Sequence, residues 1–325
     1  MASTKKAAVD DASEHPHVEQ TVDGGVSPSG YRKVVVAAGA LLTLIIFTGA
    51  LVRLTESGLG CEDWPTCSEE KIAPEWGFHA WIEFGNRLLS GVVGLGVIAA
   101  VLTAYRRNPR RDDLVRWAWF LVAGVAAQVI LGGVTVRLDL HPLLVSSHFL
   151  LSMVLLWNAM VLLAKARGGA GRPTSVLPAA LHRHSLAAVI SATVLLVTGT
   201  VVTGTGPNSG DFRADRLNFA LSDVARVHGL AAWITLALLV TLAIRMSRAG
   251  FAPTALQTPI LVAILQGALG YTQYELGVPP TLVMLHVIGA VVFFLVMLRM
   301  HLGWFERPAE HPLDRTTPSG DLVHG

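Results

Sequence analysis

Charged residues are scarce in this sequence: Asp, Glu, Lys and Arg together make up 15% of its 325 residues. An ordinary soluble domain contains about 25% of such residues. The formal net charge of +2 is small, and no basic stripe interleaved with aromatic side chains indicates nucleic-acid binding. The composition therefore argues against a water-soluble globule and predicts no nucleic-acid partner.

Cysteine is also scarce, because Cys61 and Cys67 are the only two in the chain. Two cysteines exclude a disulfide-dense scaffold and a four-cysteine zinc site. They still permit one small bridge, since only five residues lie between them.

Long apolar runs dominate what remains, with 52% of the residues hydrophobic. A hydrocarbon core about 30 Å thick needs about 20 helical residues, and the apolar residues fall into runs of about that length. They predict an all-α integral membrane protein with eight transmembrane helices in contact with the lipid bilayer. The expected spans are 33–53, 79–103, 114–135, 142–164, 185–205, 221–245, 253–272 and 281–303.

The placement of Lys and Arg predicts the orientation of these spans. Basic residues gather in the N-terminal segment and after the second, fourth and sixth spans, which the positive-inside rule assigns to the cytoplasm. They are Lys5, Lys6, Arg32, Lys33, Arg106, Arg107, Arg110, Arg111, Arg116, Lys165, Arg167, Arg172, Arg183, Arg245 and Arg248. We expect a multi-pass protein of the cell membrane with both termini cytoplasmic, which places the two cysteines on the outer, oxidising side.

An internal repeat with an offset of 138 residues divides the chain into two pseudo-equivalent four-helix bundles in parallel orientation. Gln128, Leu131, Gly132, Leu138, Pro142, Val145 and His148 recur as Gln266, Leu269, Gly270, Leu276, Pro280, Val283 and His286. Thr48-Gly49 likewise resembles Thr198-Gly199. The predicted organisation is a disordered cytoplasmic tail (1–31), a first half (32–168), a linker (169–183), a second half (184–304) and a C-terminal tail (305–325).

Three histidines are expected inside the membrane. His148, His228 and His286 lie six to eight residues from the outer ends of the fourth, sixth and eighth spans, hence about 10 Å deep at the rise of a helix. An imidazole at that depth needs a partner, and a hydrogen bond to a neighbouring helix is the plain alternative. Matched depth on facing helices favours axial ligation of a heme, so His228 and His286 predict a bis-histidine heme site. Zinc is the weaker choice because no third ligand is near.

The first half departs from this symmetry. Asn86 occupies the place that corresponds to His228, with Glu83 one helical turn away. An asparagine amide is a poor heme ligand but can orient water or bound oxygen by hydrogen bonding. Glu83 is either a proton donor or electrostatic stabiliser facing an open iron site, or the partner of Arg87 in an ion pair at positions i and i+4.

The outer loops contain further candidates. Cys61 and Cys67 favour a structural disulfide on the oxidising side, with a transient redox couple as the alternative. Three arginines near the outer ends of helices suit either heme propionates or lipid headgroups. They are Arg53, Arg137 and Arg226.

Taken together, these residues resemble the heme A synthase family of respiratory-chain assembly over about residues 34–304. The motifs are Thr48-Gly49 through Arg53-Leu54-Thr55, Ser57 to Cys61, Asp63-Trp64-Pro65, Cys67, Ile82-Glu83 with Arg87, Gln128 with Leu131-Gly132-Gly133, His148, the Thr203–Asp211 loop, His228 and His286. The resemblance implies oxidation of a methyl group of heme O to the formyl group of heme A by successive hydroxylations, for use in cytochrome oxidase. Heme O would be the substrate and heme b the cofactor.

The resemblance also implies the roles of individual residues. His228 and His286 would hold heme b, His148 would ligate the substrate heme, Glu83 would be the catalytic carboxylate, and Cys61 and Cys67 would be the outer-loop pair. The enzyme that supplies heme O and an unidentified electron donor would be partners.

The sequence departs from the family pattern at three points. Asn86 stands where a second histidine of the substrate site is common, and His79, two turns outward, replaces it only if the helix or heme shifts. Asn208 replaces a histidine of the loop after the fifth span, and the second cysteine pair of some members is absent. A b-type cytochrome that reduces quinone or iron and a non-enzymatic heme carrier are the alternative functions.

Overall fold

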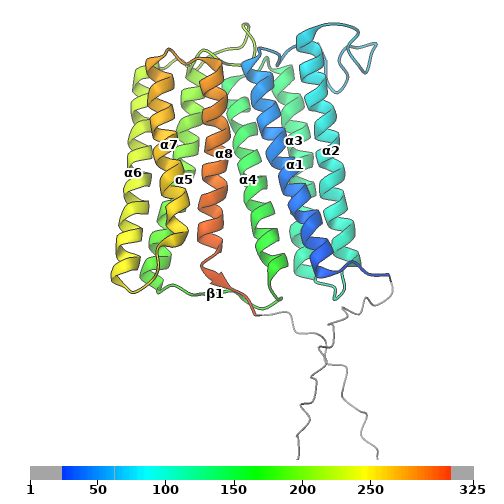
Figure 1. Ribbon diagram of the computed structural model, residues 1–325. Coiled ribbons are helices and arrows are strands. Elements are labelled where there is room, and N and C mark those ends of the chain that lie inside the picture. The colour runs from blue at the N-terminus through cyan, green and yellow to red at the C-terminus, as the bar shows by residue number, and fades with distance from the viewer. Residues whose placement is uncertain (1–23, 62, 309–325) are drawn as a thin grey trace, which may run out of the picture.

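The structure, a computed structural model, describes residues 24–61 and 63–308. Eight long helices form an upright bundle (Figure 1). Their bounds are α1 Pro28–Leu54, α2 Phe78–Arg106, α3 Asp112–Arg137, α4 Pro142–Arg167, α5 Ala179–Thr205, α6 Leu221–Arg248, α7 Thr254–Glu275 and α8 Pro280–Leu302. Two short strands, β1 Thr174–Ser175 and β2 Phe305–Glu306, pair antiparallel at the end where α8 finishes.

All eight predicted helices are present, and the differences lie at their ends. Helix α1 begins at Pro28, inside the predicted tail, because the Ser27 side chain caps it by accepting a 3.1 Å hydrogen bond from Gly30 N. Helix α5 likewise begins at Ala179, inside the predicted linker. Hydropathy detects the apolar part of a helix, whereas the terminal turns are polar and continue past it. Most of the predicted N-terminal tail, 1–23, lies outside the described residues, as does 309–325 at the other terminus.

The exterior of the bundle is apolar, as a bilayer requires. Each helix is long and apolar enough to cross a membrane, yet only 11% to 44% of its most hydrophobic 18-residue window is buried. Side chains such as Leu102, 56% exposed, and Ile130, 66% exposed, point outward. Such a surface is unsuited to water over its whole height, so the chain is a multi-pass membrane protein.

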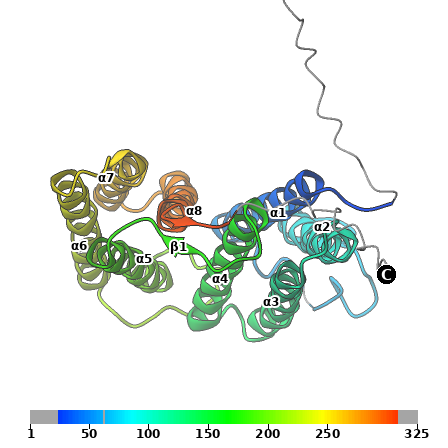
Figure 2. The ribbon, with the colours of Figure 1, turned by 90° about the horizontal axis from the view of Figure 1, so that it is seen from below.

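The helices form two rings of four (Figure 2). In the first ring α1 packs on α2, α2 on α3, α3 on α4 and α4 on α1; in the second, α5 packs on α6, α6 on α7, α7 on α8 and α8 on α5. Helices α2 and α4 are therefore diagonal to each other in the first ring, as α6 and α8 are in the second. The rings meet through α1, α4, α5 and α8.

The backbone repeats the sequence symmetry. Leu140 and Val278, separated by the 138-residue offset, both adopt positive φ, 57° and 61°. Their amides donate to equivalent carbonyls, Leu140 N to Thr135 O at 2.9 Å and Val278 N to Gln273 O at 2.7 Å. Each is followed by a proline in the first turn of the next helix. The two α3–α4 and α7–α8 connections thus have one geometry, which sets α4 and α8 equivalently in their rings.

Candidate heme sites

The imidazoles of His228 and His286 face each other across the second ring. Their centroids are 6.3 Å apart and their planes are inclined by 75°. A metal–imidazole bond of about 2.0–2.1 Å, with the nitrogen about 1 Å from its ring centroid, separates two axial rings by about 6 Å. The sequence predicted that these two histidines bind one heme. The structure places their rings at a spacing that suits one metal between them.

The orientation of His228 is set by Thr198 of α5. The Thr198 hydroxyl lies 3.0 Å from Leu195 O, to which it donates, and 3.1 Å from His228 Nδ1. Because that hydroxyl has a single proton, Nδ1–H of His228 is the donor in the second contact. The Nε2 atom therefore has a free lone pair, as a metal ligand needs when its other ring nitrogen is held by a hydrogen bond.

Glycines let the neighbouring helices approach these rings closely. A Cβ on Gly199 would lie 3.1 Å from His228 Cε1, and one on Gly270 would lie 3.3 Å from His286 Cε1. Within the described residues, His286 Nδ1 is buried without a hydrogen-bond partner. A buried polar atom of this kind is costly and is an indication that something else completes the site.

The first ring repeats this arrangement around His148. A Cβ on Gly132 would lie 3.3 Å from His148 Cε1, and His148 Nδ1 is buried without a partner among the described residues. Gln128 of α3 binds the helical turn of α4 that carries His148. Its Nε2 donates to His148 O at 3.0 Å and to Ser152 Oγ at 2.6 Å. The ring position opposite, on α2, is taken by Asn86, whose Oδ1 accepts a 2.7 Å hydrogen bond from Thr48 Oγ1.

These features fit a porphyrin better than a bare ion. No group of three or more His, Cys, Asp or Glu that could hold a metal occurs in the part of the chain that the structure describes. A metal between His228 and His286 must therefore bring further ligands, and a heme brings four nitrogens of its own. His228 and His286 would hold one heme between them, and His148 would hold another in the first ring.

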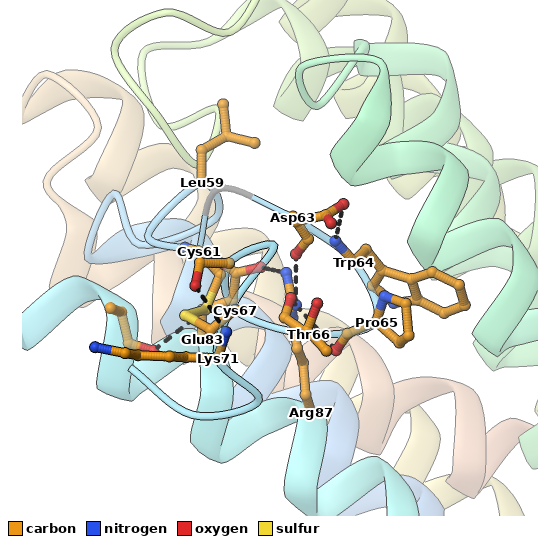
Figure 3. The surroundings of a disulfide bond; sticks show 12 residues. Leu59, Cys61, Asp63, Trp64, Pro65, Thr66, Cys67, Lys71, Glu83 and Arg87 are labelled. Carbon is orange, nitrogen blue, oxygen red and sulfur yellow. Dashed lines mark hydrogen bonds and ion pairs between the residues drawn. A yellow bond between two sulfur atoms is a disulfide. The ribbon is translucent and has the colours of Figure 1, made fainter. Parts of the chain in front are cut away.

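A disulfide joins Cys61 and Cys67 in the segment between α1 and α2. We call the end of the bundle that carries it the disulfide face. Figure 3 shows Glu83 beneath this loop, where its Oε2 accepts a 2.8 Å hydrogen bond from Cys61 N. The other carboxylate oxygen pairs with Arg87, which the sequence offered as the alternative to a catalytic role.

Arg87 extends the same network along the loop. Its Nη1 donates to Asp63 O and Thr66 O, each at 2.8 Å (Figure 3). On the other side, Arg137 Nη2 donates to Trp64 O at 3.1 Å, and a Cβ on Gly133 would lie 2.8 Å from the Trp64 ring. The loop therefore packs against α2 and α3, and the buried Glu83 binds it through the Cys61 amide.

The remaining candidates have contacts of their own. His79 Nδ1 lies 2.9 Å from Ser57 Oγ, so its ring is engaged at the surface of the disulfide face. Arg53 Nη1 donates to Asn208 O at 2.7 Å, while Arg226 is 81% exposed and 3.5 Å from Asp223. Contact with propionates or headgroups stays a prediction for these arginines.

Sequence reasoning did not assign the hydroxyls of Thr48 and Thr198 or the glycines beside the rings. The repeated Thr-Gly pairs were visible in the sequence, but which side chain each hydroxyl would meet depends on how the helices pack.

These observations define a membrane protein with duplicated histidine half-sites, one in each four-helix ring. The profile of the COX15-CtaA family, described as cytochrome oxidase assembly protein, matches residues 32–209. The match covers more than half of the chain, and the chain belongs to this family.

Curated relatives named heme A synthase are similar over shorter stretches. The protein of Geobacillus kaustophilus is 32% identical over 124 residues, 37% of this chain and 38% of the relative. That of Geobacillus thermodenitrificans is 31% identical over 106 residues, 32% of this chain and 33% of the relative. That of Lysinibacillus sphaericus is 27% identical over 172 residues, 51% of this chain and 56% of the relative. The matches thus span about a third to just over half of these relatives.

Proposed function

We propose that this protein is a heme A synthase that oxidises a methyl group of heme O to the formyl group of heme A by successive hydroxylations. The observation that carries the proposal is the duplicated half-site, with the His228 and His286 rings 6.3 Å apart in one ring and His148 in the equivalent place of the other. Family membership and relatives named heme A synthase support it.

In this proposal the second half transfers electrons and the first half binds the substrate. His228 and His286 would hold a heme b that assists electron transfer, and His148 would ligate the substrate heme in the first half. A bound heme would supply an iron that changes oxidation state. The protein would supply the imidazole nitrogens that hold it and, through Thr198, the orientation of His228.

Glu83 is proposed as the catalytic carboxylate. It is 5% exposed and shares its two oxygens between Cys61 N and Arg87. These contacts hold the carboxylate in one place at the disulfide-face end of α2, one turn from Asn86. From there it can stabilise positive charge or exchange a proton with a substrate bound in the first ring.

The proposed setting is the cell membrane, with both termini cytoplasmic and the disulfide face outside. Heme O would arrive from the enzyme that makes it, and a separate donor would supply electrons. The domain division at 32–168 and 184–304 is part of the same proposal.

The decisive experiment is to extract and separate the hemes of the purified protein. We expect heme b together with heme O or heme A, loss of heme b in His228→Ala and His286→Ala, and loss of the substrate heme alone in His148→Ala. Absence of heme, or an unchanged heme b spectrum in both second-half variants, would overturn the proposal. Reversible redox activity without heme A formation from supplied heme O would favour the b-type cytochrome.

A further inference from the structure

The two half-sites can be compared position by position, and they differ at one of six places. Five pairs are identical and the sixth replaces an imidazole by an amide. The pairs are Thr48/Thr198, Gly49/Gly199, Gln128/Gln266, Gly132/Gly270, His148/His286 and Asn86/His228. The exchange at Asn86 therefore stands among five matched pairs of residues.

The exchange leaves room in the first ring. A Cβ built on Gly199 would meet three atoms of the His228 ring within 4 Å, the nearest at 3.1 Å, whereas a Cβ built on Gly49 would meet nothing within 4 Å. No protein atom therefore fills the space next to the Gly49 Cα, whereas the equivalent space next to Gly199 contains the His228 imidazole.

The amide of Asn86 is oriented by the Thr48 hydroxyl. The Thr48 hydroxyl makes its shortest contact, 2.7 Å, with Asn86 Oδ1, against 3.2 Å to Ile45 O and 3.3 Å to Leu44 O. Thr48 thus donates to the amide oxygen and fixes the plane of the amide. The two N–H groups of Asn86 are left to donate to another acceptor.

We propose that the first half holds its heme through His148 as the sole protein ligand, and that the space beside Asn86 and Gly49 binds a small ligand, of the size of water or a diatomic molecule, to which the Asn86 amide donates a hydrogen bond. This rests on the proposed heme function and specifies the ligand class of its first-half site. The second half, closed by His228, takes no such ligand.

The test uses purified, heme-loaded protein, with carbon monoxide as the probe of an open position. We expect the ferrous wild-type protein to bind one carbon monoxide per two hemes and the ferric protein to show a high-spin signal from the same half. Asn86→His should abolish both and yield a low-spin spectrum.

A second variant tests the hydrogen bond apart from the open position. Asn86→Leu keeps the iron accessible but removes the donor, so cyanide, whose nitrogen accepts a hydrogen bond, should bind the ferric protein about tenfold more weakly, the factor expected for one lost hydrogen bond. An unchanged cyanide affinity would overturn the role of the amide.

Heme content, measured on the same samples, separates this proposal from the function on which it rests. A wild-type protein with both hemes that binds no carbon monoxide contradicts the open site alone. An Asn86→His protein that retains both hemes and still binds carbon monoxide contradicts it too. A protein without heme contradicts the proposed function.

Discussion

Single residues decide the chemistry of this protein because so few polar groups lie within its helices. Thr198 gives His228 a defined tautomer, and Glu83 bridges the Cys61 amide and Arg87. The glycines beside the rings are as informative as the histidines, because a methyl group at some of these positions would occupy the space of an imidazole.

Gly199→Ala should lower the heme content of the second half several-fold. Its Cβ would lie 3.1 Å from His228 Cε1, closer than van der Waals contact, and would displace the ring. Gly94→Ala in α2 is the control, since its Cβ also meets nothing within 4 Å and Gly94 belongs to neither half-site. Reduced-minus-oxidised spectra per mole of protein measure the result, and equal heme content in the two variants would contradict the argument.

Variants of the Glu83–Arg87 pair should separate stability from activity. Arg87→Gln leaves a carboxylate that is 5% exposed without its cation, a loss of about 3–5 kcal/mol for a buried pair. Glu83→Gln is neutral and keeps an acceptor for Cys61 N, so its loss of stability should be smaller.

Arg87→Gln should lose more stability than Glu83→Gln, but Glu83→Gln should lose more activity. We expect Glu83→Gln to form no heme A and Arg87→Gln to form some where it folds. Thermal unfolding and heme analysis of both variants provide the measurements. Full heme A formation by Glu83→Gln would remove Glu83 from the chemistry and favour the heme carrier.

At the scale of elements, the segment between α1 and α2 is held by several independent contacts. The disulfide closes it, Arg87 and Arg137 bind its carbonyls, and Gly133 allows the Trp64 ring to lie against α3. It lies above Glu83 and against α2 and α3. A loop held by this many contacts should keep its place when one is removed, at a cost in stability.

Replacing both Cys61 and Cys67 by Ala should lower stability by about 2–3 kcal/mol, the loop-entropy value for a short closed loop. The unfolding midpoint of the wild type should fall on addition of reductant, and that of the variant should not respond. Lys71→Ala, which removes an exposed ion pair with Glu75, is the control and should leave the midpoint unchanged.

If the disulfide is structural, heme A formation should stay measurable after both cysteines are replaced. Complete loss of heme A formation in a folded, heme-loaded variant would favour a redox couple.

At the scale of the whole molecule, the two rings share a core and their loops join. Phe294, Leu298 and Val291 of α8 belong to the same buried cluster as residues of α1 and α4. At the disulfide face, Gly58 N donates to Gly210 O at 2.9 Å, which ties the α1–α2 segment to the α5–α6 loop. The halves are therefore one body, although each has its own ring.

Phe294→Ala should weaken the contact between the rings. Phe294 is 5% exposed, and its truncation leaves a cavity. Because lipid is as apolar as the core, only the packing part of the usual penalty applies, and we expect on the order of 2 kcal/mol. Val292→Ala, on the same helix at 38% exposure, should have little effect on thermal unfolding in detergent. Equal losses from the two variants would contradict this account.

The Asp211–Arg213 ion pair within the α5–α6 loop should respond to acid. Asp211 accepts hydrogen bonds from Arg213 N at 2.8 Å and Arg213 Nε at 2.9 Å, and these hold the pKa of its carboxyl below the ordinary value. Since the folded pKa is the lower one, this contribution to stability is full above about pH 4, the unfolded pKa, and is lost as the pH falls through the folded value.

Asp211→Asn should therefore unfold at the same temperature as the wild type at low pH and at a lower temperature at pH 7. Thermal unfolding between pH 7 and pH 3 provides the comparison. If the unfolding temperatures of the two proteins differed by the same amount at every pH in this range, the contribution of Asp211 to stability would not depend on its charge.

The eight helices, their apolar exterior and the two-fold repeat could be predicted from the sequence because a bilayer imposes one length and one polarity on every span. His148, His228, His286 and Glu83 stood out for the same reason, since polar groups at depth are rare. The terminal turns of α1 and α5 were missed because caps and charged turns have no hydropathy signal.

By itself, then, the sequence determined the membrane class, the number of helices and which polar residues lie deep in them. Only the tertiary structure decided that Glu83 is bound to Arg87 and Cys61, that Thr48 and Thr198 orient Asn86 and His228, and that Gly49 borders open space where Gly199 borders an imidazole. The physical reason is that burial depth depends on position along one helix, whereas hydrogen bonds and close contacts depend on how several helices, distant in sequence, are turned toward each other.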